Sequence, residues 1–320
     1  MVLGIDPKVD YAFKWLLGRE DHTSILINLL HSILKPSPDE QITELQILNP
    51  FTDKPRVDDK LSILDIRARD ALGRQFNIEM QMVATGSLGK RILYYWSKLY
   101  SAQLLSGARY DLLRPTISVC FVNGVLFPAV QENHLEFRLT EKSLGISLTD
   151  DLAIHFFELP KFRLTAEELV TPLDTWLYFL RYAEDLDPEA LPEHMNTAEI
   201  RQAMEALEVI SHVDLRKEMY EDRIKAVTDE RSRLADSHSS GISIGREEGI
   251  SIGREEGERK GRLDAVPLLL EAGVSVERVA EALNLDVDEV RRATELASPA
   301  KGARPRRHVS RSPKNGSPAA

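Results

Sequence analysis

Three residues with acidic or amide side chains stand close together in the chain, and their types suit the binding of a metal ion. Asp65 lies in one short alternating segment, and Glu79 and Gln81 lie in the next, beyond a polar turn that contains Gly73. This alternation predicts that the two segments form a β-hairpin. An Asp and a Glu on adjacent strands can bind a divalent cation together. A hairpin with a solvated polar face explains the same pattern, and the hairpin alone does not decide between the two.

The elements around the hairpin must position these side chains. In the second segment apolar residues occupy positions 76, 78, 80 and 82, so Glu79 and Gln81 share the opposite face. Periodicity predicts helices at 9–17, 24–34 and 88–106, the last with Gly107 as its C-cap, a loop at 49–60, the hairpin at 61–82, and strands at 42–48, 116–121, 135–139 and 153–159. This order of helices and strands predicts a mixed α/β core.

The chain beyond residue 173 reads as helices, at 176–183 and at 198–236. Residues 241–248 have the sequence GISIGREE, and residues 249–256 repeat it. Glycine recurs every four residues from Gly241 to Gly261, which would place the glycines along one slowly turning stripe of a helix. We expect a helix–helix contact here, such as one within a homo-oligomer. A flexible spacer is the alternative, because each glycine inside a helix costs about 1 kcal/mol relative to alanine.

The last part of the chain contains a small helical module and a basic tail. Residues 263–297 predict two or three short helices, with a spacing that suits either a helix-turn-helix or a packing module. Residues 298–320 are rich in Pro, Ser, Gly and Arg, which predicts disorder. We therefore expect five regions: a catalytic core at 1–165, a helical region at 166–240, the glycine repeat at 241–262, the module at 263–297 and the tail at 298–320.

Composition limits the class of protein. The chain has 320 residues, 42% of them hydrophobic, and a formal net charge of −10. Residues 1–125 are nearly neutral, with 15 Lys and Arg against 14 Asp and Glu, whereas residues 126–298 have 20 against 37. The overall acidity therefore does not exclude a local groove for phosphates. The single cysteine, Cys120, lies in an apolar run and predicts a buried thiol in a reducing compartment. With no signal pattern and no apolar run near 20 residues, we expect a cytoplasmic protein without membrane segments.

Four groups of residues resemble a known family in the order in which they occur. They are DPKVDYAFK at residues 6–14; Leu64, Asp65 and Ile66 with Ile78, Glu79, Met80 and Gln81; Arg91, Tyr94, Tyr95, Tyr100, Gln103, Gly107 and Tyr110; and IHFFELPKF at residues 154–162. These segments resemble the PD-(D/E)xK nuclease superfamily, and more narrowly its branch of recombination-promoting (Rpn) nucleases and transposases, in which Gln replaces Lys. The resemblance covers residues 5–260.

The resemblance implies a restriction-endonuclease-like fold and a DNA endonuclease that uses Mg²⁺, with Mn²⁺ as a substitute. It implies that Asp65 and Glu79 are the principal metal ligands and that the main-chain carbonyl of Met80 is a third. Asp10 would make an outer or second-metal contact. Gln81 can orient the attacking water but supplies no positive charge.

Two cations are candidates for that missing charge. Lys14 follows Asp10 by four residues and so shares its helix face, and Arg91 matches the arginine of the family. Either one is as well explained as an ordinary surface residue. Gln103 and Tyr110 are candidates for shaping the site.

The leading hypothesis is a Mg²⁺-dependent bacterial endonuclease that acts in recombination or transposition. The rival is a catalytically degenerate protein that binds DNA or associates with itself. DNA strand transfer is a third reading. The sequence shows no zinc-ligand cluster, no phosphate-binding GxxxxGK[ST] loop and no GxSxG nucleophile elbow.

Overall fold

The computed structural model describes residues 2–49 and 65–297, and of Asp65 it describes the backbone alone. The loop expected at 50–60, the start of the hairpin at 61–64 and the tail at 298–320 lie outside the described residues. The chain divides into two compact units, one ending at Arg233 and the other beginning at Leu234. Among the described residues, no helix combines the length and the apolar composition that a membrane crossing requires.

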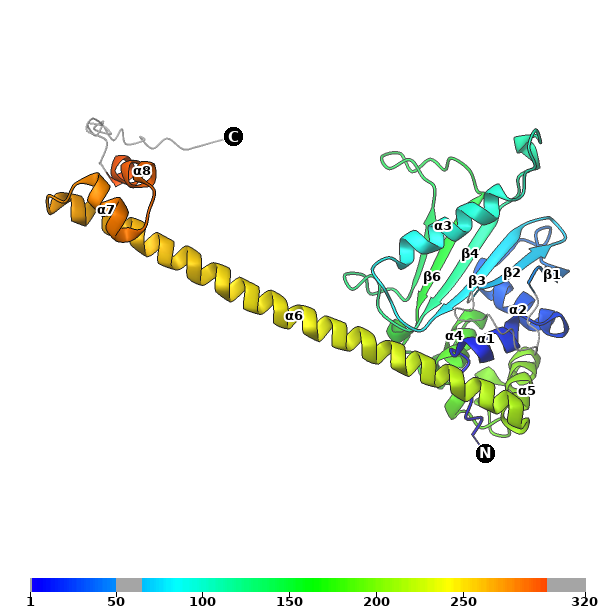
Figure 1. The fold of residues 1–320 in the computed structure, drawn as a ribbon. Coiled ribbons are helices and arrows are strands. Elements are labelled where there is room, and N and C mark those ends of the chain that lie inside the picture. Colours follow the sequence, from blue (N-terminus) through cyan, green and yellow to red (C-terminus); the bar gives the residue numbers. More distant parts are fainter. Residues whose placement is uncertain (1, 50–64, 298–320) are drawn as a thin grey trace, which may run out of the picture. The chain divides into compact units, whose positions relative to one another are not determined.

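A six-stranded mixed sheet forms the centre of the first unit, in the order β1-β2-β3-β4-β6-β5 (Figure 1). The strands are β1 (Leu45–Ile47), β2 (Asp65–Asp70), β3 (Gln75–Gln81), β4 (Thr116–Val122), β5 (His134–Arg138) and β6 (Leu152–Glu158). β3, β4 and β6 are parallel, whereas β1, β2 and β5 are antiparallel to their neighbours. The predicted α/β restriction-endonuclease-like core is confirmed.

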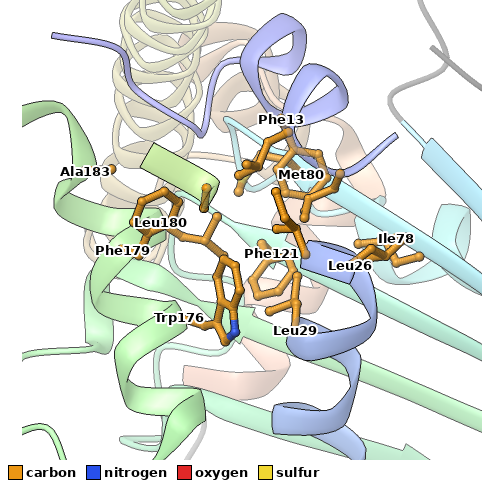
Figure 2. Close-up of a cluster of buried hydrophobic side chains, with 14 of the residues drawn as sticks. Phe13, Leu26, Leu29, Ile78, Met80, Phe121, Trp176, Phe179, Leu180 and Ala183 are labelled. Atoms are coloured by element: carbon orange, nitrogen blue, oxygen red, sulfur yellow. The ribbon is translucent and has the colours of Figure 1, made fainter. Parts of the chain in front are cut away.

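One face of the sheet carries the main hydrophobic core. It packs against α1 (Asp10–Leu17), α2 (Thr23–Leu34), α4 (Pro172–Tyr182) and α5 (Ala198–His212). Figure 2 shows Phe13 and Met80 together, with Phe121 beside Leu29 and near Trp176. Full burial of such a side chain contributes roughly 1.5–3 kcal/mol. The helices at 172–212 therefore complete the core of the sheet.

The other face is covered by α3 (Leu88–Ser101), which connects β3 to β4 (Figure 1). Leu88 and Ile92 of this helix pack on Cys120, Val122 and Phe156. This smaller cluster includes the predicted buried cysteine, whose thiol is completely covered. The polar residues of β3 lie on this face of the sheet, beneath α3.

Two helix boundaries differ from the sequence prediction. The helix expected to reach residue 106 ends at Ser101, because the chain turns back there and Gln103 bonds to Arg114 and Thr116 at the start of β4. The helix expected at 198–236 is interrupted at Val213, whose backbone is extended. A new helix, α6 (Asp214–Glu271), starts after this residue and continues through the glycine repeat.

The second unit is a small helical module. The end of α6, α7 (Val276–Leu283) and α8 (Val287–Ala297) enclose Val266, Val279, Ala280 and Val290. Gly273 has φ +86° in the turn that separates α6 from α7, which is a conformation that glycine adopts without strain. α7 and α8 are short helices, as the sequence predicts, whereas the first helix of the module is the end of the long α6.

Candidate active site

The hairpin places the two candidate carboxylates at facing positions. β2 and β3 are antiparallel, and their register pairs Asp65 with Glu79. The turn between them contains Gly73 at φ +82°, and Asp70 accepts a hydrogen bond from the backbone N–H of Arg74. These contacts fix the register, and a slip by one residue would move Glu79 to the other face of the sheet.

Glu79 is buried and its carboxylate is held on both sides. Only 2% of the surface of Glu79 is exposed. Oε1 accepts a hydrogen bond of 2.8 Å from Nδ2 of Asn77, and Oε2 accepts one of 3.1 Å from Nε2 of Gln81. All three residues lie on one face of β3, two positions apart. The carboxylate is therefore held in one orientation by the strand that carries it.

Gln81 links this carboxylate to a cation on another element. Arg91, in the second turn of α3, donates from Nη2 to Oε1 of Gln81 at 2.5 Å. Since an arginine can only donate, the amide oxygen of Gln81 faces Arg91 and its nitrogen faces Glu79. The predicted pair of Gln81 and Arg91 is thus brought together with Glu79.

Polar side chains of β3 and β4 are buried beneath α3. Across β4, Ser118 pairs with Asn77 and Cys120 pairs with Glu79. Burial raises the pKa of the Cys120 thiol well above its usual range, and the Glu79 charge adds to this effect while Arg91 opposes it. The thiol is therefore neutral. Oδ1 of Asn77 and Oγ of Ser118 are buried without a hydrogen-bond partner in the described part of the chain.

Asp10 and Lys14 lie on α1, on the first and second turns. The side chain of Asp10 is 13% exposed and lies 3.8 Å from Nε of Arg223 on α6. Two earlier residues of the same motif are structural: Lys8 pairs with Asp6 and donates to the carbonyl of Arg181, at the end of α4. Lys14 is half-buried on the same helix.

α6 contacts both α1 and the end of β3. Arg231 donates from Nη2 to the carbonyl of Met82 at 3.3 Å, one residue beyond β3. Arg223, two turns earlier on α6, faces Asp10. Because α6 rises 1.5 Å per residue, these two contacts lie about 12 Å apart along it. Asp10 and the carboxyl end of β3 therefore contact the same helix, about two turns apart.

Other residues of the motifs serve the fold. Gln103 bonds to Arg114 and Thr116 at the opposite end of β4 from Gln81. Tyr110 begins a short 3-10 helix (Tyr110–Leu112) and is 83% exposed. The amide of Gln103 therefore turns the chain after α3, at the end of β4 away from Gln81.

The histidines contain one pair that sequence reasoning missed. Nε2 of His134 and Nδ1 of His155 lie 3.0 Å apart on the neighbouring strands β5 and β6. Burial lowers the pKa of His155 to about 4. Within the side chains that the structure describes, which exclude Asp65, no three His, Cys, Asp or Glu residues gather as a metal site. The candidate metal site therefore depends on Asp65 together with Glu79.

The sheet, with an Asp and a Glu paired across its hairpin, defines a class of protein. An antiparallel hairpin carrying an Asp and a Glu, joined to parallel strands and covered by helices on both faces, is the core of a PD-(D/E)xK nuclease. The family of PD-(D/E)XK nuclease family transposases matches residues 7–237. The chain belongs to this family. No curated protein and no solved structure matches the chain significantly.

Proposed function

We propose that the protein is a Mg²⁺-dependent DNA endonuclease that acts in recombination or transposition in the bacterial cytoplasm. The observation that carries this proposal is the buried carboxylate of Glu79, which two amides hold at the position that faces Asp65. Burying a carboxylate is costly, and hydrogen bonds or a paired cation lower that cost. In a nuclease family, a carboxylate held in this way is suited to bind a metal ion.

The donor set suits a hard divalent cation. Asp65 and Glu79 would supply carboxylate oxygens, the carbonyl of Met80 would supply a main-chain oxygen, and Asp10 would make an outer contact. Oxygen ligands of this kind favour Mg²⁺ over softer metals, and Mn²⁺ is the natural substitute. A carboxylate oxygen accepts more than one contact, so the amide hydrogen bonds to Glu79 are compatible with a cation. When bound, the ion would lower the pKa of a water and neutralise charge that develops on the phosphate.

The residues of the chain would divide the remaining work. Gln81 orients a water by hydrogen bonding, and this water attacks the phosphorus atom in line with the 3′ oxygen. The bond to that oxygen breaks, which leaves a 5′-phosphate and a 3′-hydroxyl. Gln81 has no charge, but Arg91 polarises its amide through the bond at 2.5 Å. Arg91 would therefore supply from α3 the positive charge that a lysine at position 81 would carry, and Lys14 would be the second candidate.

Nicking of supercoiled plasmid with Mg²⁺ or Mn²⁺ tests this function. Wild type is compared with Glu79→Ala and Asp65→Ala, and Asp39→Ala, a change at an exposed acid of a loop, is the matched control. Removing a metal ligand raises the barrier by several kcal/mol, so we expect a loss of roughly 1,000-fold. Equal nicking by all four proteins would contradict the assignment. Products joined to a target strand would instead indicate strand transfer.

Self-association is the second function that a specific observation favours. α6 carries the glycine repeat as regular helix, and none of Gly241, Gly245, Gly249, Gly253, Gly257 and Gly261 has an atom within 4 Å of the position of an added Cβ. Ile242, Ile244, Ile250 and Ile252 on the same stretch are 56–63% exposed. We propose that this stretch contacts a second copy of the chain. Light scattering of the full-length protein tests it, and a monomer across the micromolar range would contradict it.

A further inference from the structure

Between residues 214 and 233, one side of α6 packs on the rest of the first unit through aromatic and basic residues. We call this the inner side. Tyr220 is buried, and its hydroxyl accepts a hydrogen bond of 2.7 Å from the backbone N–H of Asp6. The guanidinium of Arg216 lies 4.3 Å from the ring centroid of Trp15 on α1. These contacts set the rotation of the helix between residues 214 and 233. They determine which side chains face the candidate site.

Three arginines and most of the acids on this stretch of α6 lie on opposite sides, whereas Lys217, Lys225 and Arg233 lie outside the side of the three arginines. At about 100° per residue, Arg216, Arg223 and Arg231 fall within about 80° of one another, on the side that also holds Tyr220. The acids fall within about 100° on the outer side; they are Asp214, Glu218, Glu221, Asp222, Asp229 and Asp236. Glu230, the acid on the inner side of this stretch, pairs with Arg233. The acidity of the helix therefore faces away from the candidate site.

Two of the arginines have guanidinium groups that another ligand can reach. The side chain of Arg223 is 35% exposed, and its contact with Asp10 is a loose one of 3.8 Å. Arg231 is exposed and makes one hydrogen bond of 3.3 Å, to the neutral carbonyl of Met82. A guanidinium offers five donors, so both groups retain donors for a further anion. Arg231 lies beside the end of the strand that carries Glu79 and Gln81, and Arg223 lies about 12 Å from that contact along α6.

We propose that Arg223 and Arg231 bind backbone phosphates of the DNA strand that enters the Glu79 site. This inference rests on the proposed nuclease function and adds α6 to its substrate surface. Arginine binds phosphate through two parallel hydrogen bonds, and such contacts fix the register of DNA without reading its sequence. Because Asp10 is a candidate outer metal contact, metal binding there would also release Arg223 towards the phosphate.

Fluorescence anisotropy of a labelled duplex, in EDTA so that no cleavage occurs, tests the proposal. The full chain is compared with Arg223→Gln, Arg231→Gln and the double variant. Lys225→Gln is the matched control, because Lys225 is exposed on the outer side of the same helix. We expect each arginine variant to weaken binding roughly three- to tenfold, and the slope of log K against log salt to shrink by about 0.9 for each lost contact. The control should retain the wild-type affinity, and Arg231→Lys should keep the salt slope but lose part of the affinity, because lysine makes no bidentate contact.

The outcomes separate this inference from the proposed function. If both arginine variants and the control bind DNA as tightly as wild type, the role of α6 is overturned and the proposed nuclease function is unaffected. A wild type that binds neither duplex nor single-stranded DNA overturns both. Melting temperatures, and binding of Mn²⁺ by calorimetry, are recorded for each protein. A variant that loses DNA affinity while keeping the wild-type melting temperature supports the phosphate contact.

Discussion

Arg91 of α3 and Gln81 of β3 are joined by a hydrogen bond of 2.5 Å, and the same amide of Gln81 donates to Glu79. A cation, a neutral amide and a carboxylate therefore form one chain of hydrogen bonds across two elements. In the wider superfamily a single lysine would carry both the charge and the donor. Here the two properties are divided between two residues, and this division makes specific predictions.

Gln81→Leu and Arg91→Leu should lower the single-turnover cleavage rate by similar factors, roughly 10- to 100-fold. If the two residues act as one unit, the double variant should lose little more than either single variant. Lys90→Gln, at the exposed neighbouring residue, is the control and should cleave normally. If the two losses multiply in the double variant, Gln81 and Arg91 do not act as one unit.

Asn77→Leu should weaken the binding of Mn²⁺ by roughly 10- to 100-fold, because it removes the donor that orients Oε1 of Glu79. Isothermal titration calorimetry measures the affinity without relying on cleavage. Ser118→Ala is the control in the same buried layer, since it leaves both donors of Glu79 in place. Equal affinities in Asn77→Leu and wild type would show that Asn77 serves the fold alone.

The stability of the first unit should fall as the pH falls from about 6.5 to about 4. Burial lowers the pKa of His155 from 6.5 to about 4, so the folded protein binds a proton less readily than the unfolded chain does. The stability is fully present above the unfolded pKa and is lost progressively as the pH falls through this window. The loss amounts to roughly 3 kcal/mol.

Urea unfolding at pH 7.5, 6 and 5 measures this effect. His155→Phe should flatten the dependence, because a phenyl ring has no proton to gain. His212→Gln, at an exposed histidine of α5, should leave the dependence unchanged. An identical decline in wild type and His155→Phe would assign the acid sensitivity to other groups.

Replacing Gly245, Gly249 and Gly253 by alanine should stabilise α6 within one chain, by about 1 kcal/mol for each residue. No atom lies within 4 Å of the added methyl groups, so they meet no obstacle in the described chain. If a second copy packs closely on the glycines, the same change should weaken the association. Circular dichroism and light scattering should then move in opposite directions. A gain in helix with unchanged mass would argue that the glycines lie outside the interface.

Much of the fold could be predicted because apolar and polar residues alternate along the strands of the sheet. Phe76, Ile78 and Met80 mark the core face of β3, so Glu79 and Gln81 had to share the other face. Asn77 lies on that face too, but an asparagine near a hairpin turn reads as a turn residue. Its role depends on the distance to Glu79, which spacing alone does not give.

The contribution of α6 could not be predicted for a different reason. Arg223 and Arg231 are separated from Asp10 and Met82 by well over a hundred residues. Their charges were counted with an acidic half of the chain, where they are outnumbered. The three-dimensional packing, through Tyr220 and Trp15, determines which side of the helix meets the core. Net charge averages over both sides and hides the difference.

The N-terminal segment is tied down by parts of the chain that are made much later. Asp6 bonds to Tyr220, Trp15 donates to the carbonyl of Ala206, and the backbone of Leu3 bonds to Leu186. At a synthesis rate of roughly 5–20 residues per second, the first helix waits on the order of 10–40 s for these partners. A chain that ends before residue 206 therefore contains the candidate hairpin but lacks the partners that hold its first helix. The order of the chain thus delays the completion of the first unit, and with it the candidate site, until Tyr220 has been made.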